Sequence, residues 1–216
     1  MQLSTLTIAA ALCFVAASNV YAASSVDLRV TGTITPAACT PALSSGGIVD
    51  HGKISFQDLN PQGLTPLPDA TLILEVSCDA AALMAVKATD NRLGSAVPVY
   101  PSQPVELSHF GLGLTSDGNK IGRYALKTDN VSADGVARGV IESVTGETWL
   151  EAWTTVWQPG WMRTVNDGQG GAPLPVPLQY LKADLIVSTW IANRATLPSA
   201  EEIQIDGSAT LDIVYL

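Results

Sequence analysis

The stretch of sequence that decides the fold is Val26-Asp27-Leu28-Arg29-Val30-Thr31-Gly32-Thr33-Ile34-Thr35. Apolar residues or glycine occupy every second position from Val26 to Ile34, and only Asp, Arg and Thr stand between them. Because successive side chains of a β-strand point to opposite faces, this period of two predicts an amphipathic strand. Similar segments follow at Thr71–Ser77, Met84–Ala88, Gly111–Thr115, Gly122–Leu126, Asp184–Ile191 and Ser208–Tyr215.

Turn signals separate these expected strands. They include Ser45-Gly46-Gly47, Asn60-Pro61, Asp117-Gly118-Asn119 and Asp134-Gly135. Several short strands joined by regular turns are typical of a β-sandwich. We therefore expect an all-β sandwich, formed as a single domain over residues 23–216.

Composition and charge exclude several classes of protein. The chain has 216 residues, of which 47% are hydrophobic and 14% charged, so it is too apolar for a disordered protein. Its 20 acidic residues outnumber 11 scattered basic ones, whereas binding to a phosphate backbone needs clustered Lys and Arg. We expect no nucleic-acid partner.

The amino terminus is typical of a secretion signal. Residues 1–22 carry no charged side chain, run apolar from Leu6 to Ala17, and end in Val20-Tyr21-Ala22 before Ala23. This small-residue pattern predicts cleavage after Ala22, and the apolar run is short for a membrane span. We expect residues 1–22 to be a signal peptide and the remaining chain to be exported.

Cleavage would leave two of the three cysteines, because Cys13 would leave with the signal peptide. Cys39 and Cys78 then allow one disulfide, which would close a loop of about 40 residues and stabilise the fold by about 4 kcal/mol. The alternative is a pair of buried free thiols. Metal binding is not expected, because His51 and His109 have no Cys or His neighbour at ligand spacing.

Four tryptophans recur at intervals of four residues, at Trp149, Trp153, Trp157 and Trp161. This spacing lines one face of a strand and also stays near one side of a helix. One interpretation is an aromatic surface that stacks on sugar rings or forms an interface. The other is packing in the core and at a sheet edge.

The sequence contains no recognisable catalytic motif. It has no Gly-x-Ser-x-Gly elbow to supply a nucleophile to His51 or His109. Gly168-Gln169-Gly170-Gly171 lacks the following Lys-Ser or Lys-Thr of a phosphate-binding loop. We expect no enzymatic activity and no cofactor, although a secreted β-sandwich hydrolase with two facing carboxylates remains an alternative.

The order of four segments resembles that of a chaperone–usher pilus subunit. Gly32–Thr40 resembles the first pilin strand with its cysteine, and Ile48–Ile54 resembles the short glycine-containing strand after it. Thr71–Cys78 resembles the strand that carries the second cysteine, and Gly207–Leu216 the closing strand with its penultimate tyrosine. Within the pilins, the chain is most similar to the poorly characterised beta-fimbria major-subunit-like proteins.

This resemblance implies an immunoglobulin-like sandwich that lacks its last strand and is completed by a donated strand. A periplasmic chaperone would supply that strand first, and at an outer-membrane usher the extension of a neighbouring subunit would replace it. Residues 23–31 would be this donor extension. The inserted side chains would be Val26, Leu28 and Val30. The strand that faces the chaperone would include Ala209, Leu211, Ile213, Tyr215 and Leu216.

The resemblance implies a structural subunit of a cell-surface fimbrium that contributes to adhesion. Its neighbours would form a head-to-tail polymer, which is the open filament that heterologous contacts generate. The alternative is a secreted carbohydrate-binding or tip-adhesin module, in which the tryptophan-rich segment would bind host glycans.

Overall fold

A computed structural model describes residues 26–32, 38–100, 102, 107–152, 156–168 and 171–216. The chain divides into two units, Met1–Thr35 and Pro36–Leu216. In the first unit, residues 26–32 are exposed and have no regular secondary structure, whereas the sequence predicts a strand there. The expected signal peptide, residues 1–22, lies outside the described residues. Within them, no helix is long and apolar enough to cross a membrane.

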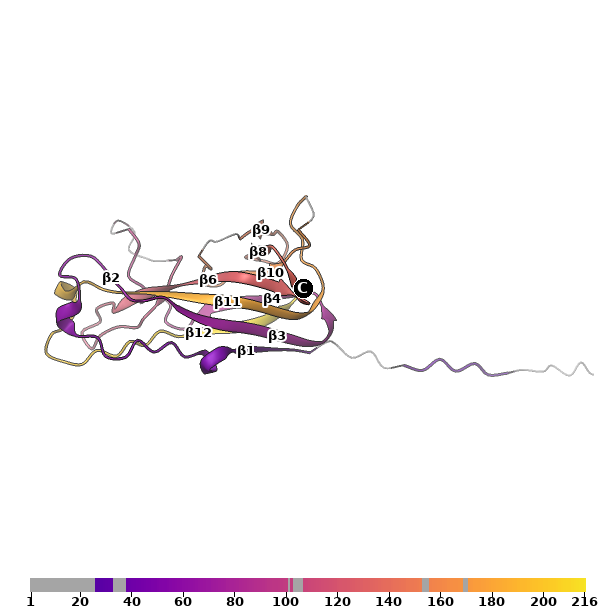
Figure 1. The fold of residues 1–216 in the computed structure, drawn as a ribbon, viewed down its shortest axis with the longest axis horizontal. Helices are drawn as coiled ribbons and strands as arrows, with labels where there is room; N and C mark the ends of the chain where they lie inside the picture. Colours follow the sequence, from indigo (N-terminus) through magenta and orange to yellow (C-terminus); the bar gives the residue numbers. More distant parts are fainter. Residues whose placement is uncertain (1–25, 33–37, 101, 103–106, 153–155, 169–170) are drawn as a thin grey trace, which may run out of the picture. The chain divides into compact units, whose positions relative to one another are not determined.

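The second unit contains a seven-stranded antiparallel sheet, which we call sheet A (Figure 1). Its main path runs in the order β1 (Cys39–Leu43), β3 (Ala70–Ala82), β11 (Leu178–Ile191), β6 (Gly122–Ala133) and β5 (Phe110–Gly111). Two short strands flank this path: β2 (Thr65–Pro66) pairs with β11, and β7 (Val136–Ala137) pairs with β6. Strand β1 therefore lies at an edge of sheet A.

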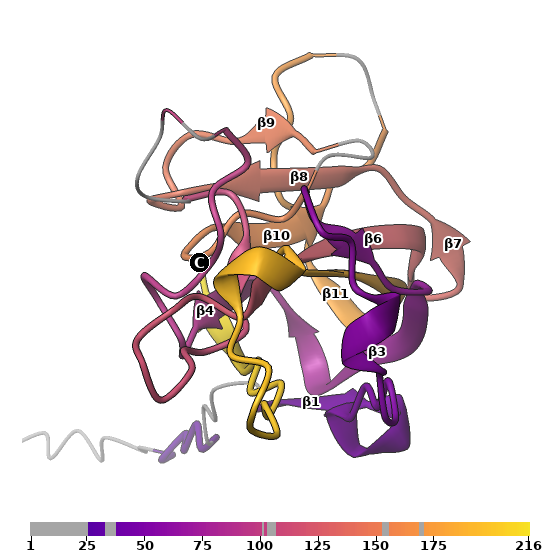
Figure 2. The same cartoon turned by 90° about the vertical axis from the view of Figure 1, so that its left-hand side faces the viewer.

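A five-stranded antiparallel sheet, sheet B, packs against sheet A. Its order is β12 (Ala209–Tyr215), β4 (Met84–Asp90), β10 (Met162–Val165), β8 (Val140–Ser143) and β9 (Leu150–Glu151). Figure 2 views the molecule along its strands. It shows sheet B, with β9, β8, β10 and β4, apart from sheet A, with β6, β11, β3 and β1. The connections include three short 3-10 turns, η1 (Ser44–Gly47), η2 (Phe56–Asp58) and η3 (Arg194–Thr196). The predicted all-β sandwich is confirmed.

The core lies between the two sheets, because each long strand buries alternate residues. In β3, Leu72, Leu74, Val76 and Cys78 are buried, whereas the residues between them are exposed or half-buried. Strand β11 shows the same alternation from Leu181 to Val187. Burying one such side chain contributes about 1.5–3 kcal/mol, so the period of two specifies which face of each strand turns inward.

A second predicted strand is wrong over most of its length. The expected Gly111–Thr115 strand ends at Gly111, because Gly113 has a φ of +86° and turns the chain out of the sheet. At Gly111 itself, a Cβ atom would lie 2.5 Å from the carbonyl oxygen of Arg92, so only glycine fits this close approach. Alternation alone does not distinguish such a turn from a strand.

Candidate functional site

An apolar groove runs along the side of the sandwich where β1 and β12 are the edge strands. It consists of two hollows of about 470 and 260 Å³ that share Val49, His51 and Ile205 in their walls. We call the two hollows together the groove. Figure 1 draws β12, in yellow, beside β1, and these two strands contact one another.

Both sheets contribute to the smaller hollow. Leu43 of β1 lies on one wall, and Ala209 and Leu211 of β12 lie on the other. The floor comes from the inward face of sheet A, including Leu126, Tyr124, Leu185 and Val187. Apolar side chains from both sheets therefore face a space that no strand of the described chain fills.

The larger hollow continues the groove beyond the ends of β1 and β12. Its apolar lining includes Ile54, Phe56 and Leu59, together with Ile121, Ile191 and Leu197. Asp50, Lys53, Glu201 and Glu202 also line it, so three acidic groups and one basic group stand at this end. The groove is lined by apolar side chains from both sheets together with polar groups such as His51 and Thr189, and it is acidic at one end.

A polar pair lies where the two hollows meet. The Nε2 atom of His51 is 3.1 Å from Oγ1 of Thr189, which is buried on β11. This hydrogen bond satisfies the threonine hydroxyl and fixes the imidazole against the floor. Among the described residues, no cluster of His, Cys, Asp and Glu that could hold a metal ion includes His51.

An ion pair holds one lip of the groove in place. Arg92, just after β4, donates from Nε and Nη2 to the carboxylate of Asp206, each at 2.9 Å. Asp206 lies between Ile205 and Gly207, which both line the smaller hollow. These hydrogen bonds hold the pKa of Asp206 below its ordinary value.

The pKa shift of Asp206 predicts that acid weakens this lip. A carboxyl whose pKa is lowered by folding adds stability above its unfolded pKa, about 3.9, and loses it as the pH falls through the lower folded value. Replacing Asp206→Asn is therefore expected to lower the urea midpoint slightly at pH 7, because both partners are exposed. The difference from wild type should vanish near pH 2; a difference that persists there would contradict this assignment.

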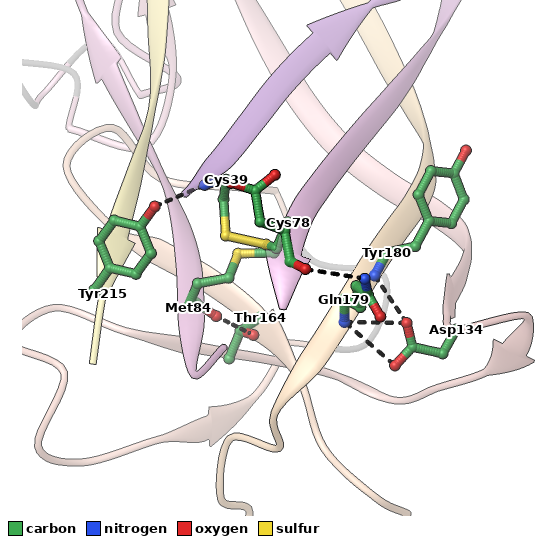
Figure 3. Close-up of a disulfide and its surroundings, with 9 residues drawn as sticks. Cys39, Cys78, Met84, Asp134, Thr164, Gln179, Tyr180 and Tyr215 are labelled. Atoms are coloured by element: carbon green, nitrogen blue, oxygen red, sulfur yellow. Dashed lines mark hydrogen bonds between the residues drawn. A yellow bond between two sulfur atoms is a disulfide. The ribbon is translucent and has the colours of Figure 1, made fainter. Parts of the chain in front are cut away.

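The predicted disulfide is present. Cys39 of β1 and Cys78 of β3 are directly opposite in the antiparallel register and are bonded to each other (Figure 3). Cys78 is buried in the core, so the bond fixes the edge strand β1 to the interior of sheet A. Tyr215 approaches the same point from β12, and its hydroxyl accepts a hydrogen bond of 2.8 Å from the Cys39 amide.

Removing the disulfide is expected to destabilise the chain strongly. The bond joins two cysteines that are 39 positions apart in the sequence. For a loop of this length, the chain-entropy relation gives a stabilisation of about 4 kcal/mol. The double variant Cys39→Ala/Cys78→Ala should lose about this much free energy of unfolding in urea. Ser77→Ala is the matched control, because Ser77 is an exposed neighbour on the same strand. A loss below about 1 kcal/mol would contradict the estimate.

The predicted donor residues are fully accessible. Val26, Leu28 and Val30 are 93%, 89% and 88% exposed, and Asp27 and Arg29 are also exposed. Isolated exposed apolar residues are ordinary, but three at alternate positions form an apolar strip on any extended chain. In this single chain the strip is not buried.

The predicted closing strand is β12. Ala209, Leu211 and Ile213 are half-buried and pack against the core, as the alternation predicts. Tyr215 and Leu216 are more than two-fifths exposed, so they stand at the surface at the end of this strand. The role of these five residues in meeting a chaperone stays a prediction.

The three described tryptophans of this segment, Trp149, Trp157 and Trp161, do not form a shared surface. Trp149 and Trp157 are 6% and 1% exposed, Trp161 is half-buried against the core, and Trp153 lies outside the described residues. The indole nitrogens of Trp149 and Trp157 donate to the carbonyl oxygens of Gly146 and Trp161, each at 3.0 Å. Because both indoles are enclosed and satisfied, the aromatic-surface interpretation is wrong for these two residues, which are core residues instead.

Comparison with known proteins identifies relatives that cover nearly the whole chain. The uncharacterised protein YhcF of Escherichia coli K12 is 31% identical over 231 residues, which cover 93% of this chain and 94% of YhcF. The chain belongs to the YhcF family. GltF of the same organism is 29% identical over 255 residues, covering 100% of the chain and 98% of GltF. A family model described as a protein of unknown function, DUF1120, matches residues 28–108.

The DUF1120 match includes the structural features that border the groove on one side. Residues 28–108 contain β1, both disulfide cysteines, His51 and strand β4. Strand β12 lies outside this match but inside the region aligned with GltF, which spans the whole chain. The alignment with GltF therefore includes both edges of the groove.

Sequence reasoning missed a buried ion pair in this YhcF-family chain. Arg163 of β10 donates to Glu142 of β8 at 2.8 Å and to the hydroxyl of Thr128 in sheet A at 3.0 Å. Its guanidinium also lies 5.4 Å from the ring centre of Trp157, and burial lowers its pKa. These side chains are brought together by cross-strand register, which no local sequence pattern reports.

Proposed function

We propose that the chain is a structural subunit of a surface pilus, exported through the periplasm and assembled by donor-strand exchange. One observation carries the proposal: an apolar groove lies between two free sheet edges, β1 and β12. A sandwich with a complete set of strands buries these inward faces. Here Leu43 and Leu211 face a hollow that one more extended strand would fill.

The donor segment in this proposal is Val26–Val30 of a neighbouring copy. Its three apolar side chains are on alternate positions and are exposed in the single chain. Burying a Val or Leu side chain contributes about 1.5–3 kcal/mol, so three such side chains supply a substantial driving force for insertion. Because each copy offers a donor and a groove, the contact is head-to-tail and generates an open filament.

A periplasmic chaperone and an outer-membrane usher complete the proposed pathway. An unfilled groove and two free edges make a chain prone to aggregation, which a chaperone strand would prevent until the neighbouring copy arrives. The same assembly needs no catalytic group or cofactor from this chain. A contribution to adhesion follows from its place at the surface of the cell.

The tryptophan-based sugar-binding alternative has less support. It requires several indole faces at the surface, whereas Trp149 and Trp157 are enclosed in the interior. The remaining half-buried Trp161 packs against the core.

Co-purification tests the proposed function. The full chain is produced in a periplasm with and without a pilus chaperone, and the soluble fraction is analysed by size-exclusion chromatography and mass spectrometry. We expect a one-to-one complex with the chaperone, and progressively longer polymers when the purified complex is incubated without free chaperone. A wild-type chain that stays monomeric at high concentration in the absence of a chaperone would contradict the proposal.

A further inference from the structure

The hydrogen bonds around β1 reveal which backbone groups point to its free edge. Neighbouring residues of an antiparallel strand direct their N–H and C=O groups alternately toward the partner and away from it. The carbonyl of Ala38 accepts from the amide of Asp79, so Ala38 faces β3. Cys39 and Cys78 are opposite one another with a Cα–Cα distance of 4.0 Å, which is typical of a pair without mutual hydrogen bonds. Cys39, Pro41 and Leu43 therefore direct their backbone groups to the free edge.

Two of these three edge positions have no amide to offer. The Cys39 amide already donates to the hydroxyl of Tyr215 at 2.8 Å, as the dashed line in Figure 3 marks. Pro41 has no N–H group, and proline at such a position blocks pairing along a sheet edge. Only the Leu43 amide remains along the free edge of β1. An incoming strand cannot form a regular ladder there.

The free edge of β12 has the opposite character. The carbonyl of Ser208 accepts from Asn91, and the amide of Leu216 donates to Leu83, so the even-numbered residues of β12 face β4. The odd-numbered residues then direct their N–H and C=O groups to the free edge. These residues are Ala209, Leu211, Ile213 and Tyr215. None is proline, and within the described part of the chain no backbone group pairs with them.

We propose that a strand entering the groove hydrogen-bonds to β12 and not to β1 along Cys39–Leu43, because Tyr215 and Pro41 cap the edge of β1. The identity of the strand, residues from Val26 of a second copy, rests on the proposed function. Strand β12 comprises seven residues and extends over about 23 Å, and its apolar residues Ala209, Leu211 and Ile213 alternate in the same way as Val26, Leu28 and Val30. The added strand extends sheet B, and its inward side chains meet Ala209 and Leu211 at the groove.

In such an assembly, the blocked edge of β1 would prevent unwanted pairing between copies. Exposed strand edges pair with one another and cause aggregation, and proteins commonly block them with proline or side-chain contacts. With β1 blocked and β12 open, the groove accepts an added strand at one of its two edges. Lateral pairing through β1 is prevented while the head-to-tail contact remains available.

Amide hydrogen exchange tests which edge accepts the strand. The full-length Leu28→Asp chain, whose own donor segment is disabled, is labelled with nitrogen-15 and mixed with a synthetic peptide of the wild-type sequence Ala23–Ile34, and exchange is followed residue by residue. We expect exchange at Leu211 and Ile213 to slow by about tenfold or more, because their amides join a ladder. The amide of Leu43 should exchange at an unchanged rate. Equal slowing at Leu43, or slowing there alone, would overturn the proposal.

Two variants test the cap independently of the peptide. Tyr215→Phe removes the hydroxyl that accepts from Cys39, so the Cys39 amide should exchange faster in the free chain. Pro41→Ala combined with Tyr215→Phe should open the edge and cause self-association through β1, measured by sedimentation velocity. Both variants also carry the substitution Leu28→Asp, which prevents one copy from donating its strand to another. The matched control is Thr40→Ala, an exposed neighbour whose backbone faces β3.

These outcomes separate the edge assignment from the proposed function. If the peptide does not bind but the two variants behave as expected, the donor segment is wrong and the capped edge stands. If Tyr215→Phe leaves the exchange of Cys39 unchanged and the double variant does not associate, the cap is refuted, whether or not the peptide binds.

Discussion

A chain that ends at Ser208 is expected to disappear from the periplasm by proteolysis. The deletion removes the eight residues Ala209–Leu216, which include all of β12. Ala209, Leu211 and Ile213 would no longer cover the core, and β4 would lose its pairing with β12 over its full length. Losing two half-buried aliphatic side chains and a whole strand of sheet B costs several kcal/mol, which is a large part of the stability of an ordinary domain.

The measurement is the abundance of the truncated chain and its co-purification with the chaperone, both relative to the full-length chain. Asp212→Asn is the matched control, since it changes an exposed residue of β12 and keeps the strand. We expect the control to remain abundant and bound to the chaperone. A truncated chain that is equally soluble, equally abundant and still bound would make β12 dispensable, and would favour a self-contained binding module.

Replacing Leu28→Asp is expected to abolish polymerisation while leaving the monomer folded. Leu28 is exposed in the single chain, so the substitution removes no contact within its own domain. In the proposed filament, Leu28 enters an apolar groove, where an unpaired carboxylate costs several kcal/mol. The Leu28→Asp chain should therefore still bind its chaperone through β12, but it should fail to insert its donor segment into the groove of a neighbouring copy.

Asp27→Asn is the control for the donor segment, because it alters the adjacent residue on the opposite side of the alternating pattern. Polymer length, measured by light scattering after release from the chaperone, should be normal for this variant and reduced to monomers for Leu28→Asp. Normal polymers from Leu28→Asp would refute the assignment of Val26, Leu28 and Val30 as donor residues.

Most of the long strands were predictable from the sequence, because the burial of one face of a strand produces the alternation directly. In Thr71–Ser77 and Ser208–Tyr215, every second residue must leave water, so the pattern is local and visible. The disulfide was predictable from the number of cysteines left after the expected cleavage. The pairing of Cys39 directly opposite Cys78, and the hydrogen bond of Tyr215 to Cys39, depend on three separate strands. Neither contact was predictable from the sequence.

The tryptophan segment and the groove mark the limit of sequence reasoning. A spacing of four residues suits a surface, a strand or a helix equally. Only the packing distinguishes them: Trp157 lies in the main core, and Trp149 lies in a second buried cluster with Ala85, Ile141 and Met162 of sheet B. The groove is lined partly by irregular chain, including His51 and Ile205, where no periodic pattern exists. Its shape depends on long-range contacts, such as the pair of Arg92 with Asp206.

Complementation between two defective variants tests the central claim most directly. Leu28→Asp has an intact groove but a disabled donor segment, and Ala209→Phe has an intact donor segment but a side chain that fills the smaller hollow. After circular dichroism confirms that both are folded, each is measured alone and in an equimolar mixture by native mass spectrometry. We predict monomers from each variant alone and one-to-one heterodimers, with no longer species, from the mixture. Polymers from either variant alone, or no heterodimer in the mixture, would contradict strand donation between copies of this chain.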